Sequence, residues 1–422
     1  MKKKILAHFD FLYTPQDKGE SVKGTKMNDV LVIEDAYIVI EDGIITKVGS
    51  GDDYTSLIDR NTLVRDHSGS IAVPGFVDSH THLVHGGSRE HEFGQKLNGV
   101  SYLEILNAGG GIISTVRSTR NASFDELYHK AEKALDDMLL LGTTTVEAKS
   151  GYGLDLENEK KQLAVAQKLN EDHPVDLVGT FMGAHAIAPE YKNDKQAYID
   201  LIIHEMLPQI KESGLAEFCD IFCEDGIFEV EDSRAILEAA KKLGFKVKIH
   251  ADEIISLGGA ELSAEVQTIS AEHLMAASDK GIRMMGQAKV IANLLPATTF
   301  SLMKNTYAPA RKMIENNVAV AISSDYNPGS CPSSNLQFAM QLGCLYLRMT
   351  PFEVLTATTL NGAYAIDRGN EIGSLEVGKK ADIAILDAPN LDYVYYHFGK
   401  NHIKDVYKNG ELVVSSKQAV YK

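Results

Sequence analysis

From residue 71 onward, short apolar runs alternate with stretches whose apolar residues recur at helical spacing. This alternation predicts strands followed by amphipathic helices. Helical stretches lie, for example, at 233–243 and 310–317. Eight β-α units are typical of a closed parallel (β/α)8 barrel of the TIM type; an open doubly wound sheet is the alternative, which spacing alone does not exclude. We expect the eight strands at 71–77, 143–147, 175–181, 218–223, 245–250, 268–273, 290–295 and 318–325.

The best-marked helix begins after Ser123. Glu126 follows three residues later, and this spacing of Ser and Glu is the sequence pattern of a capping box. Gly142 is expected to end the helix. Its predicted apolar stripe consists of Leu127, Ala131, Ala134, Leu135 and Met138.

Both ends of the chain have the pattern of short strands instead. Apolar runs at 30–33 and 37–40 precede Asp42-Gly43, which leads into a third run at 44–48. An Asp-Gly pair between β-rich runs predicts a hairpin. Further runs at 381–386 and 409–414 follow the barrel. We therefore predict a small β-sandwich domain formed by residues 1–70 and 371–422, with the barrel at 71–370.

The charge of the chain limits its partners. The 422 residues carry 58 acidic and 42 basic side chains, a formal net charge of −16. Nucleic acid and anionic membranes both need a basic face, so neither is expected as a partner. An anionic small-molecule substrate would need a local cation.

Other features of the sequence indicate a cytoplasmic protein. Four cysteines in so long a chain are too few for a disulfide framework. The N-terminal lysines are not followed by the apolar region of a signal peptide. The sequence also lacks the run of about 18 apolar residues that a membrane span needs.

Polar side chains gather at the carboxyl ends of the predicted barrel strands, where barrel enzymes have their active sites. His80 and His82 end the first strand two residues apart, so both are expected on one face. Any single histidine here could be a hydrogen-bonded core residue, but packing does not explain the whole set. Neutral imidazoles with a carboxylate suit zinc or ferrous iron, which would lower the pKa of a bound water toward about 7. The other strand ends carry His185, His250 with Glu253, His273 and Asp325.

Two motifs make the chain resemble the amidohydrolase superfamily. One opens the predicted barrel and the other closes it: Pro74-Gly75-x-x-Asp78-x-His80-x-His82 and Gly373-x-x-x-x-Gly378-Lys379-x-Ala381-Asp382. The resemblance implies one divalent metal ion, zinc or iron. Many relatives with two metals have a lysine at the end of the fourth strand, where this chain has Cys223-Glu224, in agreement with one metal. The implied ligands are His80, His82, His250 and Asp325.

Five longer motifs narrow the resemblance. They lie at 86–90 (GGSRE), 149–154 (KSGYGL), 181–186 (FMGAHA), 248–253 (KIHADE) and 325–330 (DYNPGS). Together they resemble the branch of the superfamily that hydrolyses the ring amide of 4-imidazolone-5-propanoate to N-formimino-L-glutamate in histidine degradation. The resemblance also suggests a homodimer.

This resemblance gives the site residues their expected roles. Asp325 would ligate the metal and accept a proton from water, and Glu253 would move a proton to or from the ring nitrogen. His273 would polarise the carbonyl. Arg89 is expected to bind the propionate, because its fork matches a carboxylate. The expected substrate contacts are Arg89, Tyr152, His185, Glu253, Asn327, Gly329 and Ser330, with Tyr102 as a further candidate on a helix face.

Two other functions are compatible with parts of this pattern. A related deaminase acting on cytosine or guanine would share the metal site, but a neutral base would not need Arg89. A non-enzymatic scaffold with the same barrel should have lost a ligand or Glu253, and none is missing.

Overall fold

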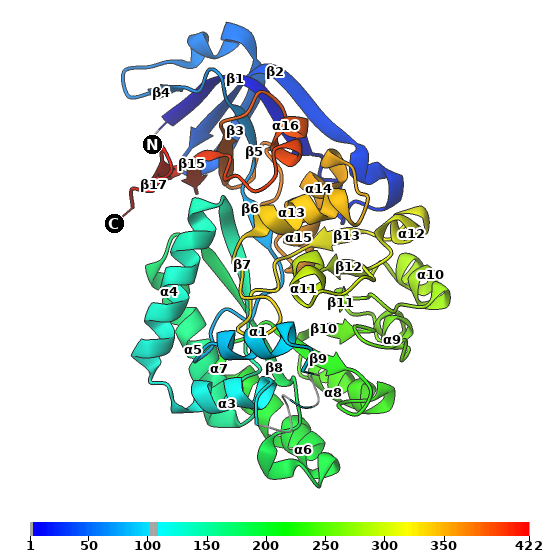
Figure 1. The fold of residues 1–422 in the computed structure, drawn as a ribbon. Coiled ribbons are helices and arrows are strands. Elements are labelled where there is room, and N and C mark those ends of the chain that lie inside the picture. Colours follow the sequence, from blue (N-terminus) through cyan, green and yellow to red (C-terminus); the bar gives the residue numbers. More distant parts are fainter. Residues whose placement is uncertain (1–2, 101–103, 105–108, 422) are drawn as a thin grey trace.

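The computed structural model describes residues 3–100, 104 and 109–421. Its two parts are a barrel and a smaller sheet built from both chain ends, shown below and above in Figure 1. Both ends of the chain lie beside the smaller sheet. The predicted combination of a (β/α)8 barrel with a small β domain is confirmed.

The barrel consists of eight parallel strands in sequential order. Seven of them have ends within three residues of the predicted runs. The strands are β6 (Phe76–Asp78), β7 (Thr143–Lys149), β8 (Asp176–Ala184), β9 (Phe218–Cys223), β10 (Lys246–Ala251), β11 (Ser270–His273), β12 (Ile291–Leu294) and β13 (Val320–Ile322).

The first and last barrel strands meet through the segments that follow them. Thr81 and Tyr326 form a parallel bridge. The Asp325 N–H donates to the His80 carbonyl at 3.1 Å, and the His82 N–H donates to the Tyr326 carbonyl at 2.9 Å. The barrel therefore closes at the level of the predicted metal ligands, and their backbones are fixed to one another.

The predicted opening strand at 71–77 is two strands, separated at Gly75. β5 (Ile71–Pro74) pairs within the smaller sheet and β6 begins the barrel. The Gly75 N–H donates to the carbonyl of Asp382, whereas the next N–H donates to the carbonyl of Gly142. A Cβ at Gly75 would collide with the Thr144 side chain, so the close approach needs glycine. The domain boundary near residue 70 stays a prediction.

The smaller sheet has nine strands, with the order β17-β16-β15-β14-β5-β1-β2-β3 and β4 paired to β1. The predicted hairpin is confirmed by the pairing of β2 with β3. The separate runs predicted at 30–33 and 37–40 are wrong, because β2 continues through both. The remaining strands are β1 (Lys3–Pro15), β2 (Val30–Glu41), β3 (Ile44–Ser50), β4 (Leu63–Asp66), β14 (Ile383–Leu386), β15 (Ile403–Lys408), β16 (Glu411–Ser415) and β17 (Gln418–Ala419).

Strand β15 was not predicted, because its local pattern is charged. Lys408 at its end is nevertheless buried, with Nζ 2.6 Å from Asp382 Oδ2 and 2.7 Å from Asp176 Oδ2. Asp176 belongs to barrel strand β8, so this lysine also ties the smaller sheet to the barrel. A charge that a single strand cannot satisfy is paired by residues distant in sequence.

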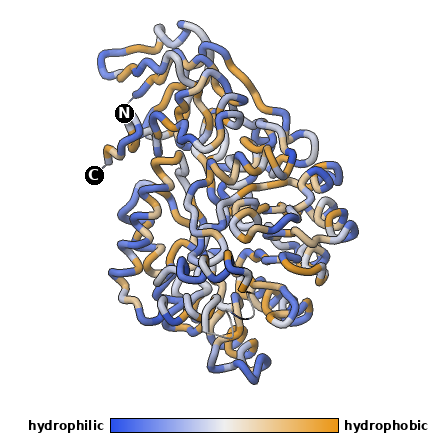
Figure 2. Tube along the Cα trace, viewed as in Figure 1, coloured by the Kyte–Doolittle hydropathy of each residue, from blue (hydrophilic) through white to orange (hydrophobic). Residues whose placement is uncertain are grey.

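Helices cover the outside of the barrel (Figure 1). The main apolar core lies between them and the strands, and Figure 2 shows hydrophobic segments along the strands and hydrophilic outer turns. Among the described residues, no helix has both the length and the apolar character needed to cross a membrane. The helices are α1 (Glu90–Leu97), α3 (Ile112–Asn121), α4 (Phe124–Leu140), α5 (Leu156–Asp172), α6 (Lys195–Leu201), α7 (Leu207–Ser213), α8 (Val230–Lys242), α9 (Gly259–Glu265), α10 (Asp279–Ala288), α11 (Pro296–Ser301), α12 (Ala310–Glu315), α13 (Leu336–Leu345), α14 (Pro351–Thr358), α15 (Leu360–Ala365) and α16 (Leu391–Tyr396).

The predicted capping box of α4 is confirmed. Ser123 Oγ accepts from the Glu126 N–H at 3.2 Å, and Glu126 Oε2 accepts from the Ser123 N–H at 2.8 Å. We expect Ser123→Ala to lower the free energy of unfolding by about 1 kcal/mol, because it leaves an N-terminal N–H of the helix without its acceptor. Urea denaturation followed by circular dichroism measures this loss. Ser123→Asn retains an acceptor and should stay close to wild type; an equal loss in both variants would contradict the capping role.

Candidate metal centre

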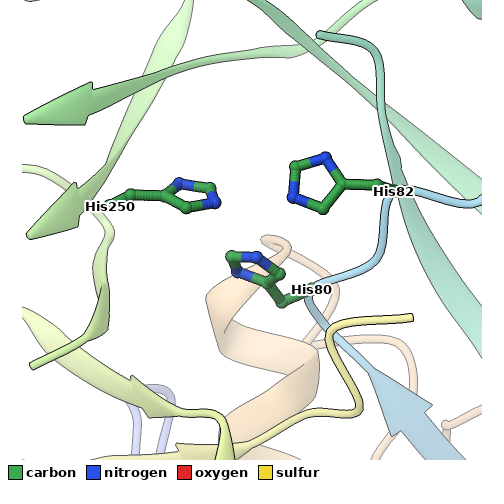
Figure 3. Close-up of side chains that lie close together, drawn as sticks. All are labelled: His80, His82 and His250. Carbon is green, nitrogen blue, oxygen red and sulfur yellow. The ribbon is translucent and has the colours of Figure 1, made fainter. Parts of the chain in front are cut away.

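Three histidines converge at the carboxyl end of the barrel. His80 and His82 come from the extended segment after β6 and His250 comes from β10; their rings point toward one another in Figure 3. One ring nitrogen of each lies within 4.8 Å of the others. The three residues are at most 2% exposed. The prediction that His80 and His82 project to the same side agrees with this arrangement.

Asp325 lies beside the histidines, immediately beyond strand β13. Its Oδ1 is 3.5 Å from His80 Nε2 and 3.8 Å from His82 Nε2. Thr298, near the start of α11, donates its hydroxyl to Oδ2 at 2.6 Å. The backbone φ of Asp325 is +55°, a left-handed conformation that aspartate tolerates better than most residues. A second group of potential ligands overlaps with the first and consists of His80, His273 and Asp325.

The electrostatics of this cluster favour a cation. Burial moves the pKa of His80 and of His82 well below its usual range, so their rings are neutral and keep a lone pair. Burial also raises the pKa of the Asp325 carboxyl to about 7. Nε2 of His80 and Nε2 of His250 are buried without a hydrogen-bond partner among the described residues. Neutral nitrogen donors and an uncompensated carboxylate fit a divalent metal ion.

Glu253 and His273 lie together next to the cluster. His273 Nε2 is 3.6 Å from Glu253 Oε2, and the His273 ring centroid is 5.1 Å from that of His250. Burial, with a further contribution from the charge of Glu224, raises the pKa of Glu253 to about 7. A carboxyl group with this pKa can both accept and release a proton near neutrality.

Arg89 lies at the start of α1 and packs on the loop at 327–330. A Cβ at Gly329 would collide with the Arg89 guanidinium, so this contact needs glycine. Arg89 Nη2 donates to Glu92 Oε2 at 2.8 Å, while the buried Nε has no hydrogen-bond partner among the described residues. The guanidinium thus keeps an unused donor beside the predicted substrate loop.

Asn327 organises this loop from within. Its Oδ1 accepts from the N–H groups of Gly329 and Ser330 at 2.9 and 2.8 Å. Its Nδ2 donates to the Asp325 carbonyl at 2.7 Å and to Ser330 Oγ at 2.9 Å. The side-chain amide is therefore committed to the loop; direct substrate contacts of Asn327, Gly329 and Ser330 stay predictions.

Tyr152 and His185 form an aromatic wall with His82. The His185 ring stacks on His82 with centroids 4.7 Å apart, and Tyr152 lies 5.2 Å from His185. His185 Nδ1 donates to the Gly151 carbonyl at 3.0 Å. Both predicted substrate residues thus lie at the metal cluster, whereas Tyr102 lies outside the residues that the structure describes.

The sequence interpretation missed several residues that support the site. His85 donates Nδ1 to the His82 carbonyl at 2.8 Å, and Thr298 holds Asp325 as described above. Asp220 and Glu272 lie next to two of the histidines. The signal for Asp220 was present in the sequence, since it is the one charged residue in an otherwise apolar barrel strand. Glu272 directly precedes the predicted site residue His273.

The chain matches a known family and closely similar relatives. The sequence profile of the amidohydrolase family matches residues 71–413. The imidazolonepropionase of Streptococcus gordonii is 58% identical over 416 residues, covering 99% of each chain. That of Streptococcus pyogenes serotype M1 is 58% identical over 410 residues, covering 97% of each chain.

Solved structures share the fold at much lower sequence identity. An adenosine deaminase from Xanthomonas campestris with bound zinc has a TM-score of 0.74 at 17% identity, over 99% of this chain and 94% of that one. The guanine deaminase of E. coli has a TM-score of 0.73 at 17% identity, over 98% and 99%. At this identity the likeness concerns the fold alone.

Proposed function

The chain belongs to the amidohydrolase family and, within it, to the imidazolonepropionases, and from this premise we propose that it hydrolyses the ring amide of 4-imidazolone-5-propanoate to N-formimino-L-glutamate in histidine degradation. The observation that carries the proposal is the 58% identity to imidazolonepropionases over nearly the full length of both chains. The buried cluster of three histidines and Asp325 supports it chemically.

The proposed ligands of the metal are His80, His82, His250 and Asp325, with zinc or iron as the ion. Neutral imidazole nitrogen and carboxylate oxygen are donors that suit both. When bound, the ion supplies a Lewis acid that polarises an oxygen and lowers the pKa of water. The buried site excludes bulk solvent, which strengthens these electrostatic effects.

Three side chains take part in proton transfer and charge stabilisation in this proposal. Asp325 accepts a proton from the attacking water. Glu253 delivers a proton to the ring nitrogen that leaves when the amide bond breaks. His273, which contacts Glu253, donates a hydrogen bond to the oxygen on which negative charge develops.

Arg89 binds the propionate group in this proposal. It is the cation that an anionic substrate needs in a chain with a net charge of −16. Its guanidinium lies against Gly329 and retains an unused buried Nε–H. Tyr152 and His185 line the same site through their contacts with His82 and support the ring of the substrate.

The test is turnover of freshly generated imidazolonepropionate, followed by the loss of ring absorbance. We expect Arg89→Ala to lower kcat/KM by about 30-fold or more, corresponding to roughly 2 kcal/mol of lost charge-assisted hydrogen bonding. Arg89→Lys keeps the positive charge but lacks the forked guanidinium, so its kcat/KM should lie between that of the wild type and that of Arg89→Ala.

An analogue with the propionate converted to its amide provides the matched control. The Arg89→Ala variant should lose much less activity on this analogue, because the charge that Arg89 pairs with is absent. An equal loss on both substrates would exclude the carboxylate-binding role. Turnover of cytosine or guanine, with none of imidazolonepropionate, would overturn the proposed reaction and retain the metal site.

The remaining part of the proposal concerns assembly and location. We propose that the protein is a homodimer, as the resemblance suggests, and that it is cytoplasmic, as its composition indicates. Multi-angle light scattering of the purified chain tests the dimer, since a monomer of 46.2 kDa is readily distinguished from its pair.

A further inference from the structure

The interior of the barrel beneath the histidines is charged. Barrels of this type are usually filled by branched apolar side chains. Here the side chains below the site include five charged residues from four strands, none more than 1% exposed: Glu147 and Lys149 (β7), Asp220 (β9), Lys248 (β10) and Glu272 (β11). Replacing buried ion pairs by apolar residues is often neutral or stabilising, so stability alone does not account for this cluster.

Two of these carboxylates reach proposed metal ligands from below. Glu272 Oε2 accepts a hydrogen bond from His80 Nδ1 at 2.8 Å. Asp220 Oδ2 lies 3.1 Å from His250 Nδ1, an ion-pair contact at hydrogen-bond distance. In His80 the other ring nitrogen, Nε2, is buried without a hydrogen-bond partner among the described residues. In His250 this holds for Nε2 and also for Nδ1, whose contact with Asp220 is an ion-pair contact only.

An ionised carboxylate only accepts hydrogen bonds. Next to a neutral imidazole it therefore favours the tautomer with its proton on the nearer nitrogen, Nδ1. The lone pair is then on Nε2, the nitrogen directed toward the cluster. Such partners fix the ring orientation and raise the basicity of a metal-ligating histidine.

Two buried lysines pair with Asp220 and Glu147 in this cluster. Lys149 Nζ lies 2.7 Å from Asp220 Oδ2 and 2.8 Å from Glu147 Oε2, and Lys248 Nζ lies 2.9 Å from Glu147 Oε1. Despite its burial, Asp220 has a pKa well below the usual range, held there by Lys149 and His250.

We propose that Asp220 and Glu272 are positioning residues of the metal centre, which hold His250 and His80 as Nδ1-protonated tautomers, so that both Nε2 atoms would offer their lone pairs to an ion. Glu147 forms ion pairs with Lys149 and Lys248 and contacts neither of these two histidines. His82 differs, because stacking on His185 holds its ring. The inference rests on the proposed metal-dependent function, and goes beyond it in naming residues that act through the ligands.

The first test compares the metal affinity of Asp220→Asn, Glu272→Gln and Glu147→Gln, measured with zinc and a competing chromophoric chelator. The first two should bind zinc about 10- to 100-fold more weakly than wild type, as for other outer partners of ligands. Glu147→Gln is the matched control, since it removes a buried carboxylate from the same cluster without touching a histidine. Wild-type affinity in Asp220→Asn and Glu272→Gln, or an equal loss in all three, would overturn the proposal.

The second test needs no variant to fold. Nitrogen NMR of full-length protein labelled on histidine and stripped of metal reports the tautomer of each ring. We expect His80 and His250 to carry the proton on Nδ1; a proton on Nε2 of either would refute the inference. If the wild-type chain bound no divalent metal, the proposed function would fail, while these spectra would still decide the tautomers.

Discussion

Replacing His250 with alanine will remove most of the bound metal and lower kcat by roughly 1,000-fold or more. The reason is that Lewis-acid stabilisation is worth several kcal/mol, and each 1.4 kcal/mol or so is tenfold in rate. Treating the wild-type protein with a chelator should cause the same loss, and zinc or ferrous iron should restore the activity. Atomic emission on the purified protein gives the metal content, and the absorbance assay gives kcat.

His129→Ala is the matched control for this experiment. His129 lies on α4 with 73% of its side chain exposed, so its removal should change neither metal content nor rate. A His250→Ala variant that retains both would mean that the overlapping group of His80, His273 and Asp325 holds the ion. In that case His273→Ala would show the loss instead, and the proposed ligand set would be wrong.

Replacing Glu253 with glutamine will lower kcat by about 100- to 10,000-fold, the usual contribution of general acid–base catalysis. Glutamine has nearly the same size as glutamate but does not transfer a proton at neutral pH. The metal content should stay at the wild-type level, because the close contact of Glu253 is with His273 rather than with the proposed ligands. Measuring kcat together with metal content separates a lost proton transfer from a damaged site, and parallel losses of metal and rate would contradict the proposal.

The pH profile gives a second measure of the role of Glu253. Its pKa is raised to about 7 by burial and by the charge of Glu224, whereas Lys304 lowers it. Glu253 is therefore protonated below about pH 7 and charged above it. The profile of kcat/KM against pH should have a limb near this pH, where Glu253 changes its protonation state. Glu224→Gln removes a like charge and should move the limb to lower pH. Removing the exposed Lys304 cation, as in Lys304→Gln, should move the limb to higher pH, and Glu253→Gln should abolish it.

The periodicity of the chain determined most of the fold. Strand β9 lies at the predicted 218–223, and α4 has its predicted cap, because burial and capping act between residues close in sequence. At Gly75 the local pattern of apolar residues gave a wrong prediction. The run 71–77 reads as one strand, but its two halves have partners in different sheets, and only those long-range hydrogen bonds separate them.

The polar residues at the strand ends could likewise be identified from the sequence. Histidines at 80, 82, 250 and 273 and the carboxylate at 325 lie at or just beyond the carboxyl ends of predicted strands, and parallel strands in a barrel bring these ends to one rim. The resemblance of the motifs to a known family then gave the reaction. The sequence by itself thus determined the barrel, the donor atoms available at its rim and the chemical class of the reaction.

Only the tertiary structure decided how those donors are held. Asp220, Glu272 and Lys149 are separated by tens of residues. Their charged groups contact one another or the histidines only because the closed barrel brings them together beneath the histidines, away from water. The structure also gives Asn327 a role that the sequence did not show, since its side chain holds its own loop, while its predicted substrate contact stays a prediction. The physical reason is the same in both cases: a buried polar group must find partners, and those partners are set by the packing of distant segments rather than by sequence neighbours.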